Sequence, residues 1–162
     1  MDSEAKTIQH LISIGDPLTG EPYGVREHPC WQTRGLRLEF DDIERESPSC
    51  SWYRPVTQEQ VAQLIQFSQG IKPGDKGILI HCQAGISRST AAAVIVRLCQ
   101  YEQLRGGCQD MIPAVLREVQ AIQPLAKPNR RMIWLTDRVL GLGGRLIQEY
   151  QVVFPNSIEF SL

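Results

Sequence analysis

The most constraining feature of the sequence is a short apolar run that passes through a tight turn into an alanine-rich segment. The run is Gly77-Ile-Leu-Ile-His81, and the alanine-rich segment is Ala91-Ala-Ala-Val-Ile-Val-Arg-Leu98. A continuous apolar run of this length is typical of a strand whose two faces are both buried. The alanine-rich segment predicts a buried helix. Because such a strand needs cover on both sides of its sheet, we expect an α/β fold.

The rest of the chain predicts further strands and helices of the same kind. Two strands are expected at 10–14 and 35–40, the second from its clean alternation of apolar and polar residues. Helices are expected at 57–70, 110–123 and 129–140, and a Gly/Pro-rich loop between the first two strands. The tail at 150–162 fits either a strand or a docked extension. We therefore expect one three-layer domain over residues 1–162, with a central, mostly parallel sheet flanked by helices.

Composition excludes several classes of function. Seventeen basic residues face eighteen acidic ones, so the net charge of −1 gives no footprint for nucleic-acid binding. No apolar stretch is long enough to span a bilayer, and the start is polar, which predicts a cytoplasmic protein. The five cysteines and three histidines form no paired ligand motif, so we expect reduced thiols, no metal and no cofactor.

The turn after the apolar run carries the residues suited to chemistry. Cys82 and Arg88 are separated by five residues, enough to wrap one anion with backbone N–H groups: Gln83, Ala84, Gly85, Ile86 and Ser87. The helix that begins near Arg88 adds unpaired N–H groups, and the guanidinium suits two phosphate oxygens. Gly85 permits the backbone angles of a tight ring. The segment 82–88 therefore predicts a site for a tetrahedral oxyanion, and we call it the phosphate loop.

The same surroundings predict that Cys82 is a nucleophile. A helix N-terminus and a nearby arginine lower the pKa of a cysteine thiol, so a thiolate is expected at neutral pH. The hydroxyl of Ser89 lies at the right spacing to hydrogen-bond the sulfur. Such a thiolate is able to attack phosphorus.

These residues resemble the protein-tyrosine phosphatase signature His-Cys-x-x-Gly-x-x-Arg-Ser/Thr, which the chain carries complete from His81 to Ser89. The resemblance implies a phosphatase fold, a metal-free mechanism through a phosphocysteine, and a structural role for His81 beneath the loop. Phe40-Asp41-Asp42-Ile43 and Pro128-Asn129 are similar to segments of small bacterial members of this superfamily.

The resemblance also implies a general acid on a loop upstream of the cysteine. The acidic loop after the second expected strand offers Asp41, Asp42, Glu44 and Glu46. We choose Asp42 because it matches the Phe-x-Asp-Ile pattern, with Asp41 second. A solvated acidic loop without a catalytic role is the simpler interpretation of the same residues.

Several functions remain open at this point. The leading one is hydrolysis of phosphotyrosine, and also of phosphoserine or phosphothreonine, in a phosphorylated protein or small phosphomonoester. A lipid or inositol phosphate phosphatase is disfavoured by the neutral side chains of the loop. Sulfur transfer and an inactive phosphopeptide-binding module also stay open, as does the oligomeric state. We expect Trp31, Trp52 and Tyr53 to serve mainly in packing, with a pocket for a phenyl ring as the alternative. Cys99 and Cys108 are expected in the core, with a redox role as the alternative for Cys99.

Overall fold

The computed structural model describes residues 8–45, 51–72, 75 and 77–155, and its centre is a sheet of three parallel strands. The strands are β1 (His10–Gly15), β2 (Gly35–Glu39) and β3 (Ile78–His81), in the spatial order β2-β1-β3. Ile12 of β1 is in register with Leu36 on one side and with Ile80 on the other. The expected parallel sheet is confirmed, and within the described residues every strand pair is parallel. The expectation that the run 77–81 forms a strand buried on both faces was wrong. β3 lies at the edge of the described sheet, none of its four residues is buried, and Leu79 is 39% exposed.

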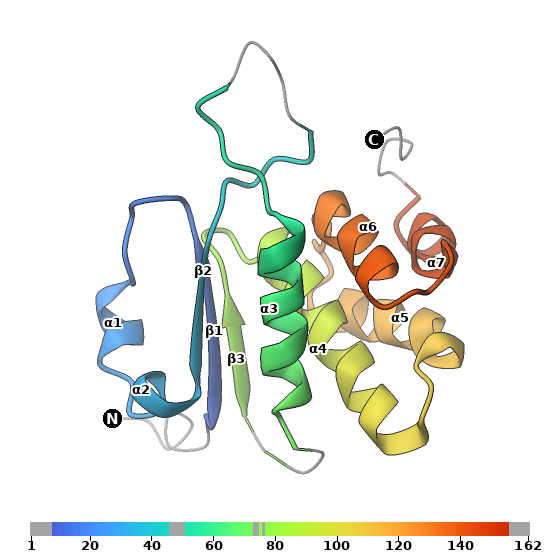
Figure 1. The fold of residues 1–162 in the computed structure, drawn as a ribbon, viewed down its shortest axis with the longest axis horizontal. Coiled ribbons are helices and arrows are strands. Elements are labelled where there is room, and N and C mark those ends of the chain that lie inside the picture. Colours follow the sequence, from blue (N-terminus) through green and yellow to red (C-terminus); the bar gives the residue numbers. More distant parts are fainter. Residues whose placement is uncertain (1–7, 46–50, 73–74, 76, 156–162) are drawn as a thin grey trace.

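Helices cover both faces of the sheet, which gives three layers (Figure 1). Two short helices, α1 (Tyr23–Arg26) and α2 (Trp31–Arg34), connect β1 to β2, where the sequence predicted only a loop. The longer α3 (Gln58–Gln69) connects β2 to β3. Because the chain moves in opposite directions across the sheet in these two connections, right-handed crossovers place their helices on opposite faces.

The second face also carries the C-terminal half of the chain (Figure 1). It comprises α4 (Arg88–Arg105), a short 3₁₀ turn (Gln109–Met111), α5 (Ile112–Ile122), α6 (Arg130–Val139) and α7 (Arg145–Val153). Of the two expectations for the tail, the strand was wrong over 150–153, which are helical, and Tyr150, Val153 and Phe154 are packed into the core as in a docked extension. Residues 156–162 lie outside the described residues. The missed signal is the helical spacing of the buried Leu146, Tyr150 and Val153.

The hydrophobic core lies between the sheet and the helices of this second face. The central strand β1 contributes Ile12 and Ile14, and the alanine-rich part of α4 is largely buried against the sheet and its neighbouring helices. The helix α3 begins with the expected capping box, in which Thr57 and Gln60 satisfy each other's backbone N–H groups. No helix among the described residues is long and apolar enough to cross a membrane.

The sheet opens a crevice at the carboxyl ends of β1 and β3. The loop after β1 leads to the α1 and α2 face, whereas the loop after β3 leads to α4 on the other face (Figure 1). Neighbouring strands whose loops separate in this way form the usual ligand-binding place of an open α/β sheet. A pocket of about 260 Å³ lies here, and Asp16, Cys82 and Gln83 are among the residues that line it.

Candidate active site

The turn between β3 and α4 is the phosphate loop predicted from the sequence. Gly85 has a φ of 71°, in the left-handed region that favours glycine. Ser87 is the N-cap and α4 begins at Arg88, so the first unpaired N–H groups of the helix belong to the loop itself. The hydroxyl of Thr90 donates to the carbonyl oxygens of Ile86 at 2.5 Å and Ser87 at 2.9 Å, which fixes the end of the loop.

Cys82 lies half-buried at the start of this loop, with its Sγ 3.2 Å from the hydroxyl oxygen of Ser89. Burial acts to raise the pKa of the thiol. Hydrogen bonds from the Ser89 hydroxyl and from the backbone of Ser89 and Gly85, together with the charge of Arg88, outweigh burial, so the pKa is lowered. The loop therefore favours the thiolate form of Cys82.

Arg88 is only 2% exposed, and one side of its guanidinium is already held. Its Nη1 donates to a carboxylate oxygen of Asp16 and to the carbonyl oxygen of Phe40, each at 2.7 Å. Its Nε is buried and has no hydrogen-bond partner among the described residues. Because an unsatisfied buried donor is costly, an oxygen of a bound oxyanion would improve this site.

Asp42 reaches the phosphate loop from the segment after β2. Its Oδ1 accepts hydrogen bonds from the Ser87 hydroxyl at 2.6 Å and from the side-chain amide of Asn129 at 2.9 Å. Its Oδ2 lies 3.9 Å from the Nε of Arg88. The Asp42 side chain is 37% exposed, so solvent reaches it although it is hydrogen-bonded to the phosphate loop.

The other acidic candidates are held elsewhere. The carboxylate of Asp41 accepts from the backbone N–H of Arg54 at 2.6 Å, within its own loop. Glu44 pairs with the backbone N–H and the guanidinium of Arg130 at the start of α6. Glu46 lies outside the described residues. Of these candidates among the described residues, only Asp42 contacts the phosphate loop.

His81 sits directly before the loop, and its imidazole is partly buried. Burial lowers the pKa of the ring, which favours the neutral form. The ring Nε2 is buried without a hydrogen-bond partner among the described residues. His81 also lines the 260 Å³ pocket, as Asp16 does.

Two residues of the site were missed by the sequence analysis. Asp16, the first residue after β1, holds Arg88 in place. Asn129, fully buried, caps α6 by accepting from the backbone N–H of Met132 at 3.1 Å and also donates to Asp42. The position of Asp16 at the carboxyl end of a central strand was a usable signal, since loops there form the crevice.

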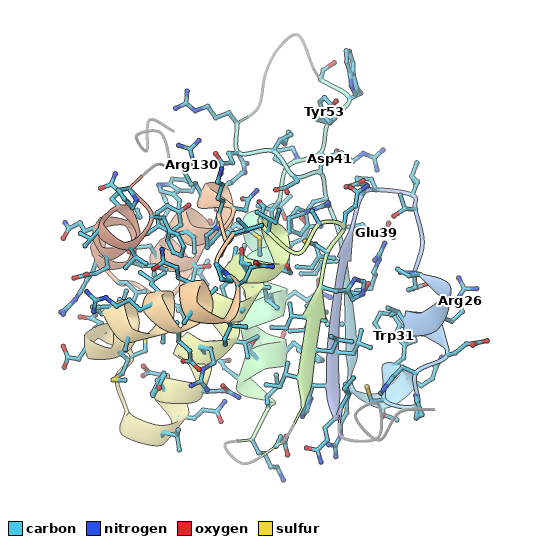
Figure 2. All side chains as sticks on the ribbon, turned by 180° about the vertical axis from the view of Figure 1, so that it is seen from behind. Arg26, Trp31, Glu39, Asp41, Tyr53 and Arg130 are labelled. Atoms are coloured by element: carbon cyan, nitrogen blue, oxygen red, sulfur yellow. The ribbon has the colours of Figure 1, made fainter. Side chains whose placement is uncertain are left out.

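Of the other residues discussed in the sequence analysis, two aromatic residues are exposed and two cysteines are buried. Trp52 and Tyr53 are 70% and 45% exposed, so the expectation that they mainly pack is wrong, and Figure 2 shows Tyr53 standing out on its loop. Burial raises the pKa of Cys99 to about 12 and that of Cys108 to about 11, which makes both thiols inert. No group of three or more His, Cys, Asp or Glu side chains in the described part of the chain is arranged to hold a metal ion.

Three comparisons with known proteins bear on the site. The human protein phosphatase Slingshot homolog 3 is 32% identical over 78 residues, which cover 44% of this chain and 11% of that protein. The crystal structure of the Yvh1 phosphatase domain from Chaetomium thermophilum has the same fold, with a TM-score of 0.52 and 18% identity, over 86% of this chain and 82% of that one. No family model matches the sequence.

Proposed function

We propose that the chain is a member of the protein-tyrosine phosphatase superfamily, and that it is a cysteine-dependent phosphatase that hydrolyses phosphomonoesters through a phosphocysteine; its similarity to the two phosphatases supports this. The observation that carries the proposal is the phosphate loop. There the pKa of Cys82 is lowered, and the buried Nε of Arg88 has no hydrogen-bond partner among the described residues. We propose that residues 1–162 act as one catalytic domain.

In the first step the Cys82 thiolate attacks phosphorus. A P–S bond forms as the P–O bond to the leaving alcohol or phenol breaks, and Asp42 in its protonated form gives a proton to that oxygen. The Nε of Arg88 and the N–H groups of residues 83–88 stabilise the negative charge on the three phosphoryl oxygens. Asp42 is suited to this role because it contacts Ser87 and remains partly exposed to solvent.

In the second step water attacks the phosphocysteine. Asp42, now a carboxylate, takes a proton from that water, and the P–S bond breaks to release inorganic phosphate. The hydroxyl of Ser89 donates to the departing sulfur, which its 3.2 Å contact with Cys82 supports. The side-chain amide of Gln123 donates to the carbonyl oxygen of Gly85 at 3.1 Å, so Gln123 lies beside the phosphate loop.

We propose phosphotyrosine, and also phosphoserine or phosphothreonine, as the phosphorylated group. The side chains of Gln83, Ala84, Ile86 and Ser87 are neutral, which fits a substrate with one phosphate better than an inositol polyphosphate. A thiolate nucleophile also has to stay reduced, which supports a cytoplasmic location.

The test is hydrolysis of para-nitrophenyl phosphate in the presence of EDTA. We expect metal-independent turnover by the wild-type protein, none by Cys82→Ser, and a loss of about 10²- to 10⁴-fold in Asp42→Asn with a phosphopeptide substrate. Asp41→Asn is the matched control, since Asp41 contacts its own loop, and it should stay within about threefold of wild type. Well-folded protein that binds phosphopeptide without turnover would instead identify an inactive binding module.

A further inference from the structure

A hollow of about 360 Å³ opens next to the phosphate loop, apart from the pocket that contains Cys82. We call it the apolar groove. It lies between the segment after α5 and the end of α7. Its lining is mostly apolar and includes Ile86, Leu125, Ala126, Tyr150, Val153 and Phe154. Ile86 belongs to the phosphate loop, so the groove adjoins this loop.

The floor of the groove is already formed without a ligand. Tyr150 and Phe154 are 1% and 7% exposed, and their ring centroids are 5.1 Å apart. The Tyr150 hydroxyl donates to the carbonyl oxygen of Pro128 at 2.9 Å, which fixes the ring. A preformed apolar floor binds a side chain without the cost of ordering it first.

Exposed apolar side chains occur at the rim of the groove and on the elements beside it. Leu125, which lines the groove, is 69% exposed. Outside the lining, Ile122 at the end of α5 and Val152 in α7 are 77% and 67% exposed. Single exposed apolar residues are ordinary on protein surfaces. Several of them on the two elements that enclose one groove indicate an interaction surface.

The wall of the groove is tied to the phosphate loop by backbone contacts. The N–H of Lys127 donates to the carbonyl oxygen of Ile86 at 2.9 Å, and the N–H of Asn129 donates to that of Ser87 at 3.2 Å. Lys127 is also the one charged residue among the described residues that line the groove, and it is exposed. An ammonium group at the rim favours a negatively charged partner over a cationic one.

We propose that the apolar groove binds a large apolar side chain (Leu, Ile, Met or Phe) of a phosphopeptide substrate, a few positions from the phosphorylated residue. The inference rests on the proposed phosphatase function and adds the substrate class. A peptide fits because the groove adjoins the phosphate loop, which contributes Ile86 to its lining. An extended chain advances about 3.3 Å per residue, so a nearby residue reaches the groove while the phosphate stays in the loop.

The test compares kcat/KM for matched phosphotyrosine peptides that carry either Leu or Ala at each of the positions flanking the phosphotyrosine. For the wild-type protein we expect one flanking position at which Leu is preferred over Ala by about 10-fold or more, the discrimination typical of an apolar pocket. In Leu125→Asp the ratio of the two values should fall to about one, because a carboxylate at the rim opposes the apolar side chain. Because the measured quantity is kcat/KM for the Leu peptide divided by kcat/KM for the Ala peptide, a general loss of activity in the variant cancels.

Leu104→Asp is the matched control. Leu104 is 60% exposed near the end of α4 and does not line the groove, so the preference should persist in this variant. Equal rates for Leu and Ala peptides at every position, with normal hydrolysis of para-nitrophenyl phosphate, would overturn the groove inference and leave the proposed function intact. No turnover of any substrate would contradict the proposed function itself.

Two different occupants of the groove would give distinct results. If a second copy of the chain covered the groove, Leu125→Asp would dissociate a dimer in analytical ultracentrifugation while the peptide ratio stayed unchanged. If residues 156–162 of the chain itself covered it, their removal would raise kcat/KM for all peptides alike. Either result would contradict the substrate role.

Discussion

At the scale of single residues, the candidate site depends on which groups accept hydrogen bonds from the guanidinium of Arg88. Asp16 and the carbonyl oxygen of Phe40 both accept from the Nη1 of Arg88, whereas Nε has no hydrogen-bond partner among the described residues and lies 3.9 Å from the Oδ2 of Asp42. Arg88 is almost fully buried, so its charge needs these contacts to be tolerated. The same contacts hold the guanidinium in one orientation, and within the described part of the chain they leave the N–H groups of Nε and Nη2 unused.

Replacing Asp16→Asn tests this positioning role. The variant keeps an acceptor but loses the charge, so we expect kcat/KM for para-nitrophenyl phosphate to fall by about 10- to 100-fold. The inhibition constant of inorganic phosphate should rise in parallel, since Arg88 would hold the oxyanion less well. An unchanged inhibition constant would show that Asp16 does not act through Arg88.

Replacing Ser89→Ala tests the origin of the lowered thiol pKa. The hydroxyl hydrogen bond favours the thiolate, so its loss should raise the pKa of Cys82. Because only the thiolate is alkylated, the pH profile of iodoacetamide labelling at Cys82 should shift to higher pH. Ser89→Thr keeps the hydroxyl and should leave the profile in place. A profile unaffected in Ser89→Ala would assign the lowered pKa to the loop backbone and Arg88.

At the scale of secondary structure elements, the start of α6 is joined to the site through Asn129. This residue caps the helix, donates to Asp42 and contacts Ser87 through its backbone, so three separate segments meet there. The sequence predicted a helix beginning at this point and an acidic candidate at Asp42. It did not predict that the cap and the acid touch, because the contact joins residues far apart in the chain.

Asn129→Ala and Thr57→Ala form a matched pair of cap deletions. Each removes one N-cap side chain, so each should lower the free energy of unfolding by about 1 kcal/mol in urea titrations. Only Asn129→Ala also removes one of the two hydrogen bonds that hold Asp42, and its kcat with a phosphopeptide should fall by about 10-fold or more. Equal activity in the two variants would mean that the amide contact does not position the acid.

At the scale of the whole molecule, local patterns predicted the architecture better than they predicted the site. The apolar run 77–81 and the alanine-rich helix predicted a covered parallel sheet, but the buried central strand is β1, and the run itself forms the edge strand β3. The order β2-β1-β3 is consistent with right-handed crossovers whose helices lie on opposite faces. The loop residues from Cys82 to Ser89 were identifiable because they are contiguous in sequence. Asp16 and Asn129 join the site only through folding, and the short α1, α2 and the final α7 lacked strong signals.

Ile12→Ala tests the contribution of the central strand. Ile12 is fully buried and pairs with both neighbouring strands, so we expect the free energy of unfolding to fall by about 2–5 kcal/mol. Leu79→Ala on β3 is the control, since Leu79 is 39% exposed and should cost less than about 1.5 kcal/mol. Urea denaturation followed by fluorescence measures both, and equal losses would contradict a core centred on β1.

The central claim is that Cys82 carries the phosphoryl group between the two chemical steps. The most direct measurement is to mix the protein with para-nitrophenyl phosphate, quench with acid during turnover, and locate any phosphorylated residue by mass spectrometry. We predict one phosphoryl group on Cys82 in the wild-type protein and none in Cys82→Ser. A phosphoryl group on another residue, or turnover that persists in Cys82→Ser, would contradict the mechanism.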